Sequence, residues 1–594
     1  YITANGLLGH FYPTKEMTIS DRDPPFITPK IKSLLRKKNQ LMRRSHVEHA
    51  SAIAEKIKSL IVRKNVGRLT YLSSSSSAKT IWSEVRLITG ASRRQNIPDN
   101  FDADQINFHY CNISTDLNYE SPYVKHSVNS ELTEYVSEWT VFKLLNNLKP
   151  TATGSDDLPF WYLRLCAAFF AAPLSHLFNL SLKTSVFPKQ WKSAIIHPIP
   201  KTLIPASPSD LRPVSVIPIL SRIFERAVNM KFLIPALSSL PINLDISNQY
   251  AYRPTGSTTA ALIAILSHIT ELLKTHTHVY VITFDYSKAF DTLKHSSLAS
   301  KLAQINIPDC IYNWIIDYLS DRSHSTLLHG KLSQSASINA SIVQGSVLGP
   351  TLFNVNSCDL ISVSSLNKYF KYADDAYLVV PGSNASSIPI ELDHHTAWAA
   401  KSNLKLNPSK TSEIIFSRRN YPNPPLNQGI QRHDNLKVLG VLVDNELSFN
   451  QHVRETIKSC MQTLFALKIM KSFGLTPVIL QTIFKSLVIS KLLYASPSWW
   501  GFISAQNKDM LVAFLNKVVR FGYYKVNDPG LYELQNNIER KLFQNIASNP
   551  AHALHELLPT VRVNKHNLRP RGHNFNLPAK DDKNFITRCL YTFI

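Results

Sequence analysis

Two apolar segments that end in aspartates restrict the possible folds of this chain most strongly. Residues 278–295 read HVYVITFDYSKAFDTLKH. β-Branched and aromatic residues dominate positions 279–284, which predicts a buried β-strand ending at Asp285. Residues 369–380 read YFKYADDAYLVV, where two apolar runs flank Asp374 and Asp375. This spacing predicts a β-hairpin with the acidic pair at its tip.

Each of these carboxylates has a catalytic and a local interpretation. A carboxylate at the end of an apolar strand is unfavourable unless a cation or hydrogen bonds compensate it, so Asp285 is either a metal ligand or an N-cap. Asp374 and Asp375 repel each other unless a divalent cation holds them ionised, but Asp also favours ordinary turns. Together, the three side chains suit a pair of Mg²⁺ ions. Polymerases and two-metal nucleases share such a site, so the carboxylates alone leave both open.

The charge of the chain indicates a polyanionic partner. Lys and Arg number 65 against 42 Asp and Glu, which gives a net charge of +23. Such an excess favours binding to nucleic acid through counterion release, although a merely soluble basic protein is the alternative. The six cysteines form no Cys-x-x-Cys pair, which argues against a zinc knuckle and a disulfide framework. No apolar run reaches about 18 residues, so no membrane span is predicted.

The N-terminal region contains a basic amphipathic pattern. Residues 29–44 read PKIKSLLRKKNQLMRR, and Thr28 followed by Pro29 is typical of a helix start. A second helix is expected at 52–66, and the serines at 73–77 predict a flexible break. The basic helix is either a nucleic-acid contact or a solvated charged face. Helical patterns alternate with strands up to about residue 455 and dominate beyond it, which predicts an α+β protein.

Six segments, in the same order along the chain, resemble the motifs of reverse transcriptases from non-LTR (LINE-type) retrotransposons. They are NQYAYRPTGSTTAAL (248–262), FDYSKAFD (284–291), SIVQGSVLGPTLF (341–353), YADD (372–375), SNLKLNPSKTSEIIF (402–416) and VLGVLVDNELSFNQH (438–452). The stretches LKPTATGSDDLP (148–159) and DLRPVSV (210–216) resemble jockey-like elements in particular. The order of the six motifs argues against a two-metal nuclease.

The resemblance implies an RNA-directed DNA polymerase with an α+β right-hand fold of fingers, palm and thumb, plus helical N-terminal and C-terminal extensions. The expected parts are a basic, mainly helical extension (1–100), a connector (101–139), fingers and early palm (140–275), a palm with the catalytic motifs and a primer-grip hairpin (276–454), a helical thumb (455–530) and a C-terminal extension (531–594).

The resemblance also implies roles for individual residues. Asp285, Asp374 and Asp375 are expected to bind two Mg²⁺ ions, with Mn²⁺ as a substitute. Lys201 and Arg212 would reach the incoming triphosphate, and Lys410 would donate a proton or charge to the pyrophosphate. The remaining nucleotide-binding residues are Tyr286, Phe290, Gln344 and Gly345. Phe290 would lie against the nucleotide sugar, with a core aromatic as the alternative, and a surface lysine is the alternative for Lys410.

The expected partners are an RNA template, a DNA primer, target DNA and dNTPs, without a membrane. We expect a nuclear and cytoplasmic protein, and a sequence that lacks the endonuclease domain that precedes this region in the family. The competing hypothesis is a decayed or domesticated copy that only binds RNA and for which a metal is irrelevant.

Overall fold

A computed structural model describes residues 6–7, 10, 29–44, 46–69, 97–126, 135–407, 410–417, 424–425, 429–472, 475–562 and 572–593. Contacts divide the chain into two units. Unit 1 comprises Tyr1–Lys15, Gln95–Ala261 and His268–Asp434, and unit 2 comprises Glu16–Arg94, Leu262–Ser267 and Asn435–Ile594. Each unit is described here by itself.

Unit 1 contains two larger β-sheets. The catalytic-motif sheet has the order β12-β11-β3-β9-β8, and the other has the order β2-β1-β5-β6 with β7 also paired to β5. Strands of the first are β3 (His278–Phe284), β8 (Lys368–Tyr372), β9 (Asp375–Pro381), β11 (Ser412–Ser417) and β12 (Gln431–Arg432). Strands of the second are β1 (Ser193–Pro200), β2 (Leu211–Val216), β5 (Arg322–Leu328), β6 (Lys331–Leu332) and β7 (Ala336–Ile338). The short strands β4 (Tyr286–Ser287) and β10 (Lys405–Leu406) form a separate pair.

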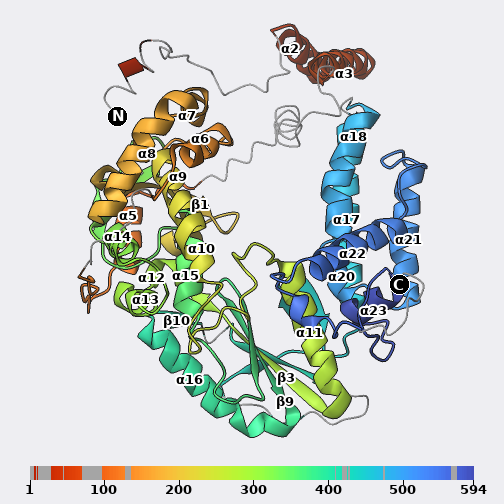
Figure 1. Cartoon of the computed structure of the whole chain (residues 1–594). Coiled ribbons are helices and arrows are strands. Elements are labelled where there is room, and N and C mark those ends of the chain that lie inside the picture. Colours follow the sequence, from red (N-terminus) through yellow and green to blue (C-terminus); the bar gives the residue numbers. More distant parts are fainter. Residues whose placement is uncertain are drawn as a thin grey trace. The chain divides into compact units, whose positions relative to one another are not determined.

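The helices of unit 1 surround these sheets (Figure 1). They are α5 (Ala103–Ile113), α6 (Glu138–Asn146), α7 (Phe160–Leu165), α8 (Ala167–Thr184), α9 (Ile219–Val228), α10 (Ile234–Ala236), α12 (Ala289–Thr292), α13 (His295–Leu302), α14 (Asp309–Leu319), α15 (Gly349–Ser357) and α16 (Ile388–Lys401). Helix α11 (Thr258–Thr275) belongs to unit 1 at both ends, while its middle part, Leu262–Ser267, belongs to unit 2. A π-helical turn, Asn229–Leu233, joins α9 to α10.

The catalytic-motif sheet is covered on both faces because its strands are apolar on both sides. Tyr369 and Phe370 are neighbours on β8, so their side chains point to opposite faces. Tyr369 donates to or accepts from His395 of α16 at 3.0 Å, whereas Phe370 lies 5.6 Å from the ring of His268 on α11. The central strand β3 is almost fully buried between its neighbours. The sheet is therefore a rigid support for whatever its strand ends carry.

Unit 2 is mainly helical. Its helices are α2 (Pro29–Arg43), α3 (Val47–Leu69), α17 (Asn450–Ser472), α18 (Pro477–Phe484), α19 (Ser490–Leu492), α20 (Ser496–Trp499), α21 (Ala505–Arg520), α22 (Leu531–Ser548) and α23 (Phe585–Thr592). The hairpin of β13 (Asn435–Val438) and β14 (Val441–Asp444) also belongs to this unit. The Tyr494 hydroxyl donates to the Leu439 carbonyl at 3.0 Å, which fixes the hairpin to the helices. The predicted palm range, 276–454, therefore crosses the boundary between the units.

Several expectations from the sequence are met and others are refined. The α+β class is confirmed, as are the basic helix at 29–44 and a helix over 52–66. Thr28 and the serines at 73–77 lie outside the described residues. The predicted connector at 101–139 contains α5, whose Ile106 and Tyr110 are buried in a small core with Leu211 of β2. The polar Asn107 is buried with them, whereas the apolar Phe108 is exposed, so the packed face of the helix does not stand out from the sequence.

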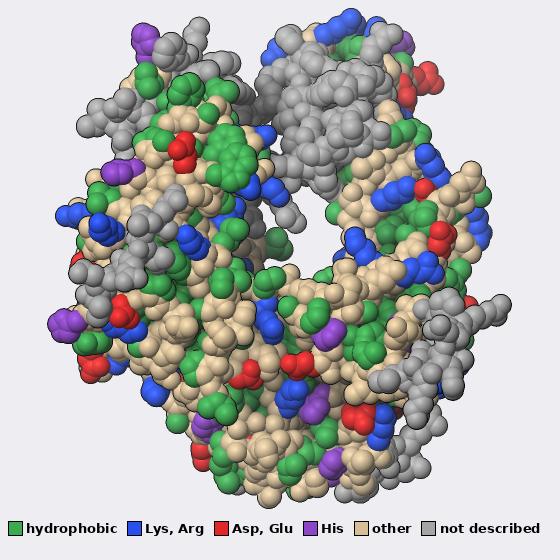
Figure 2. Space-filling model, in the orientation of Figure 1, with side chains coloured by type: hydrophobic (Ala, Val, Ile, Leu, Met, Phe, Trp, Pro, Cys, Tyr) green, Lys and Arg blue, Asp and Glu red, His purple; other side chains and the backbone are tan. Residues whose placement is uncertain are grey.

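The structure also shows where the basic side chains and the longest apolar helical run lie. Lys and Arg side chains are spread over the visible face of each unit rather than gathered in one patch (Figure 2). Within the described part of the chain, one helical run, Pro477–Trp499, is long and apolar enough to cross a membrane. Of its apolar window of 18 residues, 44% is buried inside the protein, and a single run of this kind is weak evidence for a membrane span.

Candidate active site

The register of the catalytic-motif sheet brings three charged side chains together. Phe284 of β3 is paired with Ala376 of β9, so the next residue, Asp285, lies opposite Asp375. On the other side Thr283 is paired with Ser412 of β11, which places Asp285 next to Lys410. The Lys410 Nζ lies 3.2 Å from Asp285 Oδ2. Two of the predicted metal ligands and the predicted pyrophosphate-binding lysine therefore meet at one edge of the sheet.

The hairpin between β8 and β9 carries the acidic pair. Tyr372 is paired with Asp375, so the turn consists of Ala373 and Asp374, and Ala373 has a φ of 54°. The buried Gln249 supports this turn, because its Oε1 accepts the backbone N–H of Ala373 at 3.0 Å. Both aspartates were predicted at the tip of the hairpin, whereas Asp375 is the first residue of β9. Gln249 was missed, although it lies within the predicted motif at 248–262.

Electrostatic repulsion is strong at this edge. Burial, together with the nearby charges of Asp374 and Asp285, raises the pKa of Asp375 to about 6. Burial and Asp285 also raise the pKa of Asp374 above its usual range. A divalent cation would relieve this repulsion, and oxygen ligands suit Mg²⁺. The chemistry of these carboxylates therefore suits a divalent cation.

The described residues do not include a complete protein cage for a metal ion: no three His, Cys, Asp or Glu side chains are gathered closely enough to form one. Mg²⁺ is usually held by one or two carboxylates, while waters and substrate phosphates complete its shell. Two carboxylates on adjacent strands, with a third at the neighbouring turn, meet that smaller requirement.

Basic side chains face the same region from other elements. Lys201 follows β1, and its Nζ donates to the Ser209 carbonyl at 2.9 Å. Arg212 is exposed on β2, and its positive charge lowers the pKa of Asp374 and of Asp291. Lys288 also acts on Asp291 and was missed by the sequence analysis. All three cations lie close enough to Asp291 to act on its pKa, and their positive charges would suit a triphosphate.

The segment around Gln344 and Gly345 is fixed against β2. The backbone N–H of Ser215 donates to the Gln344 carbonyl at 3.0 Å. Gly345 has a φ of 119°, and a Cβ at this position would collide with the Ser215 carbonyl oxygen. Only glycine fits this close approach. The close approach that glycine permits at this position is made to the backbone of β2.

The two predicted aromatic residues lie in different surroundings. Phe290 is half-buried and stacks on Phe353 of α15, with 4.6 Å between the ring centroids. Tyr286 is buried, and its hydroxyl is hydrogen-bonded to Nε2 of His395 at 2.6 Å. The Tyr286 side chain therefore packs under α16, which gives no support to its predicted nucleotide contact. Phe290 remains a candidate for that contact.

A further carboxylate, Asp291, was not singled out from the sequence. It is only 9% exposed, and burial raises its pKa to about 7. The signal was available, since Asp291 is the last residue of the FDYSKAFD motif. A second carboxylate next to apolar residues in the same motif is therefore a candidate for a residue that supports the site.

The stability of the protein is expected to depend on pH through Asp291. The folded protein retains the Asp291 proton up to about pH 7, whereas the unfolded chain releases it near 3.8. The group therefore favours the folded state at low pH, and this contribution is lost as the pH rises from about 4 through 7. Thermal unfolding measures the Tm of Asp291→Asn and of wild type. As the pH rises over this range, the Tm of the variant should increase relative to that of wild type. A difference independent of pH would contradict this expectation.

Comparison with known proteins assigns this region to a family. Residues 199–443 match the family described as reverse transcriptase (RNA-dependent DNA polymerase). These residues form a reverse transcriptase domain. The domain contains the aspartates on β3 and at the β8–β9 turn, and it includes Lys201, Arg212, Gln344 and Lys410. Its presence confirms the resemblance and the α+β polymerase fold that the six motifs predicted.

Curated relatives of the reverse transcriptase domain come from non-LTR retrotransposons. The chain is 27% identical over 365 residues to the probable RNA-directed DNA polymerase from transposon X-element of Drosophila melanogaster, covering 58% of this chain and 39% of that protein. It is 28% identical over 319 residues to the RNA-directed DNA polymerase from mobile element jockey of the same species, covering 51% and 34%. The chain therefore spans well under half the length of these relatives.

Among solved structures, apo telomerase from Candida tropicalis covers 90% of this chain and 98% of its own, with 12% identity. Its TM-score of 0.34 is too low to support a structural conclusion.

Proposed function

We propose that this chain is an RNA-directed DNA polymerase of a non-LTR retrotransposon, which extends a DNA primer on an RNA template. The observation that carries the proposal is the position of Asp285 between Asp375 and Lys410 on one sheet edge of a reverse transcriptase domain. A nucleotidyl transfer needs carboxylates for metal ions and a cation near the leaving group. Both are supplied by the ends of adjacent strands.

Asp285, Asp374 and Asp375 would hold two Mg²⁺ ions, with Mn²⁺ as a substitute. When bound, these ions would lower the pKa of the primer 3′-hydroxyl and offset negative charge on the phosphates. The protein's basic side chains would bind the phosphates of the nucleotide. Lys201 and Arg212 would hold the triphosphate, and Lys410 would supply charge or a proton to the pyrophosphate as it leaves.

Selection of the sugar is proposed to depend on Phe290. Its ring is fixed by stacking on Phe353 and lies edge-on to Tyr252 at 6.4 Å. A fixed ring excludes a 2′-hydroxyl better than a mobile one, because it has no alternative position to adopt. Gln344 and Gly345 would form the adjoining wall of the nucleotide pocket.

The remaining parts are proposed to hold nucleic acid. The catalytic-motif sheet would act as the palm, and helices α17 to α21 as the thumb. The net charge of +23 supports binding to a template–primer duplex through its phosphates. Recognition of an RNA–DNA duplex would depend on shape and 2′-hydroxyl contacts more than on base sequence. DNA at a genomic target is a further proposed partner.

The test is primer extension by the purified chain on poly(rA)·oligo(dT) with dTTP and Mg²⁺. Wild type is expected to extend the primer, and the Asp374→Ala, Asp375→Ala double variant is expected not to do so. Extension should require Mg²⁺ or Mn²⁺ and should disappear in EDTA.

Two other outcomes would overturn the proposal. Salt-sensitive RNA binding without extension would favour a decayed or domesticated copy that acts only as an RNA-binding protein. Metal-dependent shortening of the primer, in place of extension, would favour a nuclease.

A further inference from the structure

Two segments distant in sequence, 290–293 and 341–344, are joined by hydrogen bonds beside the nucleotide pocket. The backbone N–H of Ile342 donates to the Phe290 carbonyl at 2.8 Å, and that of Ser341 donates to the Leu293 carbonyl at 3.0 Å. A third bond joins side chains, since the Gln344 Nε2 donates to Asp291 Oδ1 at 3.0 Å. These bonds connect the segment of the proposed sugar-selecting ring to that of the pocket glutamine.

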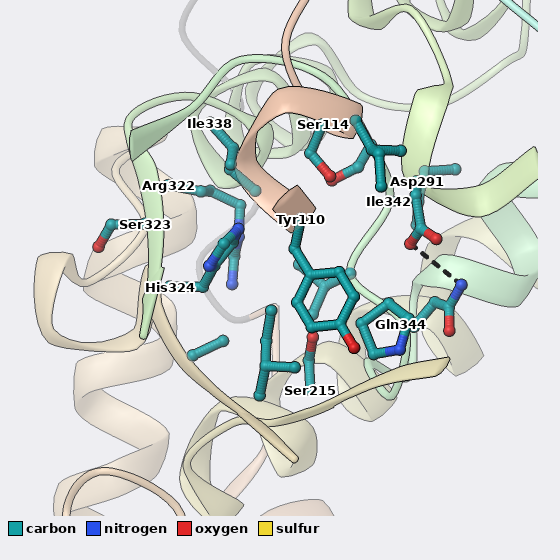
Figure 3. A pocket seen from close by; sticks show the side chains of 16 residues that line it. Tyr110, Ser114, Ser215, Asp291, Arg322, Ser323, His324, Ile338, Ile342 and Gln344 are labelled. Atoms are coloured by element: carbon teal, nitrogen blue, oxygen red, sulfur yellow. Dashed lines mark hydrogen bonds between the residues drawn. The ribbon is translucent and has the colours of Figure 1, made fainter. Parts of the chain in front are cut away.

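The Asp291–Gln344 bond lies at the edge of a cavity (Figure 3). Tyr110 of α5 reaches into this cavity, which Ser215 of β2 and His324 of β5 also line. The hydroxyl of Tyr110 is buried and has no hydrogen-bond partner. The Gln344 amide therefore remains paired with Asp291 and not with the nearby phenol.

Orientation matters for an amide because its two ends have opposite hydrogen-bonding character. The NH₂ group donates and the oxygen accepts, so a rotation of the amide exchanges a donor for an acceptor. The C=O oxygen of a carboxyl group accepts whether or not the group carries a proton, and Asp291 Oδ1 is the acceptor of this bond. Asp291 therefore selects the orientation in which Gln344 directs its NH₂ group toward the carboxylate, and the amide oxygen and second N–H are left for another partner.

We propose that Asp291 is a positioning residue of the nucleotide pocket: by accepting from Gln344, it fixes the amide that contacts the incoming deoxynucleoside triphosphate. This inference rests on the proposed function and extends it to a residue that does not itself touch the nucleotide. The backbone of Gln344 is already held by its hydrogen bond with Ser215. Asp291 therefore restricts only the side-chain torsions of Gln344. Pre-organised contacts strengthen binding because less conformational entropy is lost on binding.

The basic residues around Asp291 offer an alternative role for its charge. Lys288, Lys201 and Arg212 all lower its pKa through their positive charges, so Asp291 could serve mainly to balance them. The two roles differ in what Asp291→Asn does. Asparagine keeps an oxygen that can accept from Gln344 but has no charge.

The experiment measures the Kd of dTTP for the complex of the chain with poly(rA) and a chain-terminated oligo(dT) primer, so that catalysis is not required. Asp291→Ala and Gln344→Ala should each weaken dTTP binding about tenfold, the effect of losing roughly one buried hydrogen bond. The double variant should bind no more weakly than the weaker single variant, because the two residues act as one unit. Asp291→Asn should stay within about threefold of wild type.

Several outcomes would overturn the inference. Additive effects in the double variant would show that Asp291 acts independently of Gln344. Equal losses in Asp291→Asn and Asp291→Ala would show that charge balance is its role. An unchanged Kd with a lower Tm would show a structural role only, and absence of dTTP binding by wild type would remove the pocket altogether.

A matched control is Glu391→Gln on α16. Glu391 is also a fully buried carboxylate, and it accepts the backbone N–H groups of Val363 and Ser364. It does not line the cavity beside Asp291. This variant should lower the Tm without changing the Kd of dTTP. Wild type that binds dTTP but does not extend a free primer would refute the proposed function alone, while the Asp291 measurements would still decide this inference.

Discussion

Asp285→Asn is expected to lower kcat for primer extension by on the order of a thousandfold, about 4 kcal/mol of transition-state stabilisation. The side chain keeps its shape but loses the charge that would hold a divalent cation. Stability should not fall with activity. Asp285 raises the pKa of Asp374 and Asp375 by repulsion, so its neutralisation makes their ionisation easier. The Tm in EDTA is therefore expected to be unchanged or higher, since the exposed pair with Lys410 contributes about 0–1 kcal/mol.

The control for this substitution is Asp393→Asn, which neutralises an exposed carboxylate on α16 of the same unit. This variant should extend primers at the wild-type rate. Steady-state extension on poly(rA)·oligo(dT) measures kcat, and thermal unfolding in EDTA measures stability. Extension by Asp285→Asn within tenfold of wild type would remove Asp285 from the catalytic site. A large fall in Tm would mean that the lost activity reflects unfolding.

The sequence allowed the central part of the site to be predicted because its determinants are local. The strand at 278–284 ends at Asp285 because an apolar run is followed by a carboxylate, and the hairpin at 368–381 follows from two apolar runs around a turn. Strand pairing was not predictable in this way. The position of Lys410 beside Asp285 depends on the register between β11 and β3, which lie more than a hundred residues apart.

The residues that sequence analysis missed are those whose roles depend on tertiary contacts. Gln249 supports the β8–β9 turn from a distant segment, and Asp291 meets Gln344 across 53 positions. The packed face of α5 was missed because only four of its residues are buried and one of them, Asn107, is polar, while the apolar Phe108 is exposed. The hairpin at 435–444 was included in the palm range through its resemblance to a primer-grip hairpin, and by its contacts it belongs to the helical unit.

Gly345→Ala is expected to lower both stability and kcat/KM. Its φ of 119° is unfavourable for an L-residue, which contributes about 1–3 kcal/mol of strain. The added Cβ would also collide with the Ser215 carbonyl, and the overpacking contributes about 1–3 kcal/mol more. Relief of this collision requires the Gln344–Gly345 segment to move away from β2. Since a displacement of about 1 Å at a reacting site can lower a rate a hundredfold, kcat/KM for dTTP should fall by about that factor.

Gly330→Ala distinguishes the effect of backbone strain from the effect of the collision. Alanine at position 330 would have the backbone strain but would not collide with a neighbouring atom. Gly330 lies between β5 and β6 with a φ of 80°, and a Cβ there meets nothing within 4 Å. This variant should lose about 1–2 kcal/mol of stability and keep the wild-type kcat/KM. Denaturant unfolding and dTTP titration of both variants provide the comparison. If Gly345→Ala matched Gly330→Ala in both measurements, the contact between the Gln344–Gly345 segment and β2 would have no part in nucleotide binding.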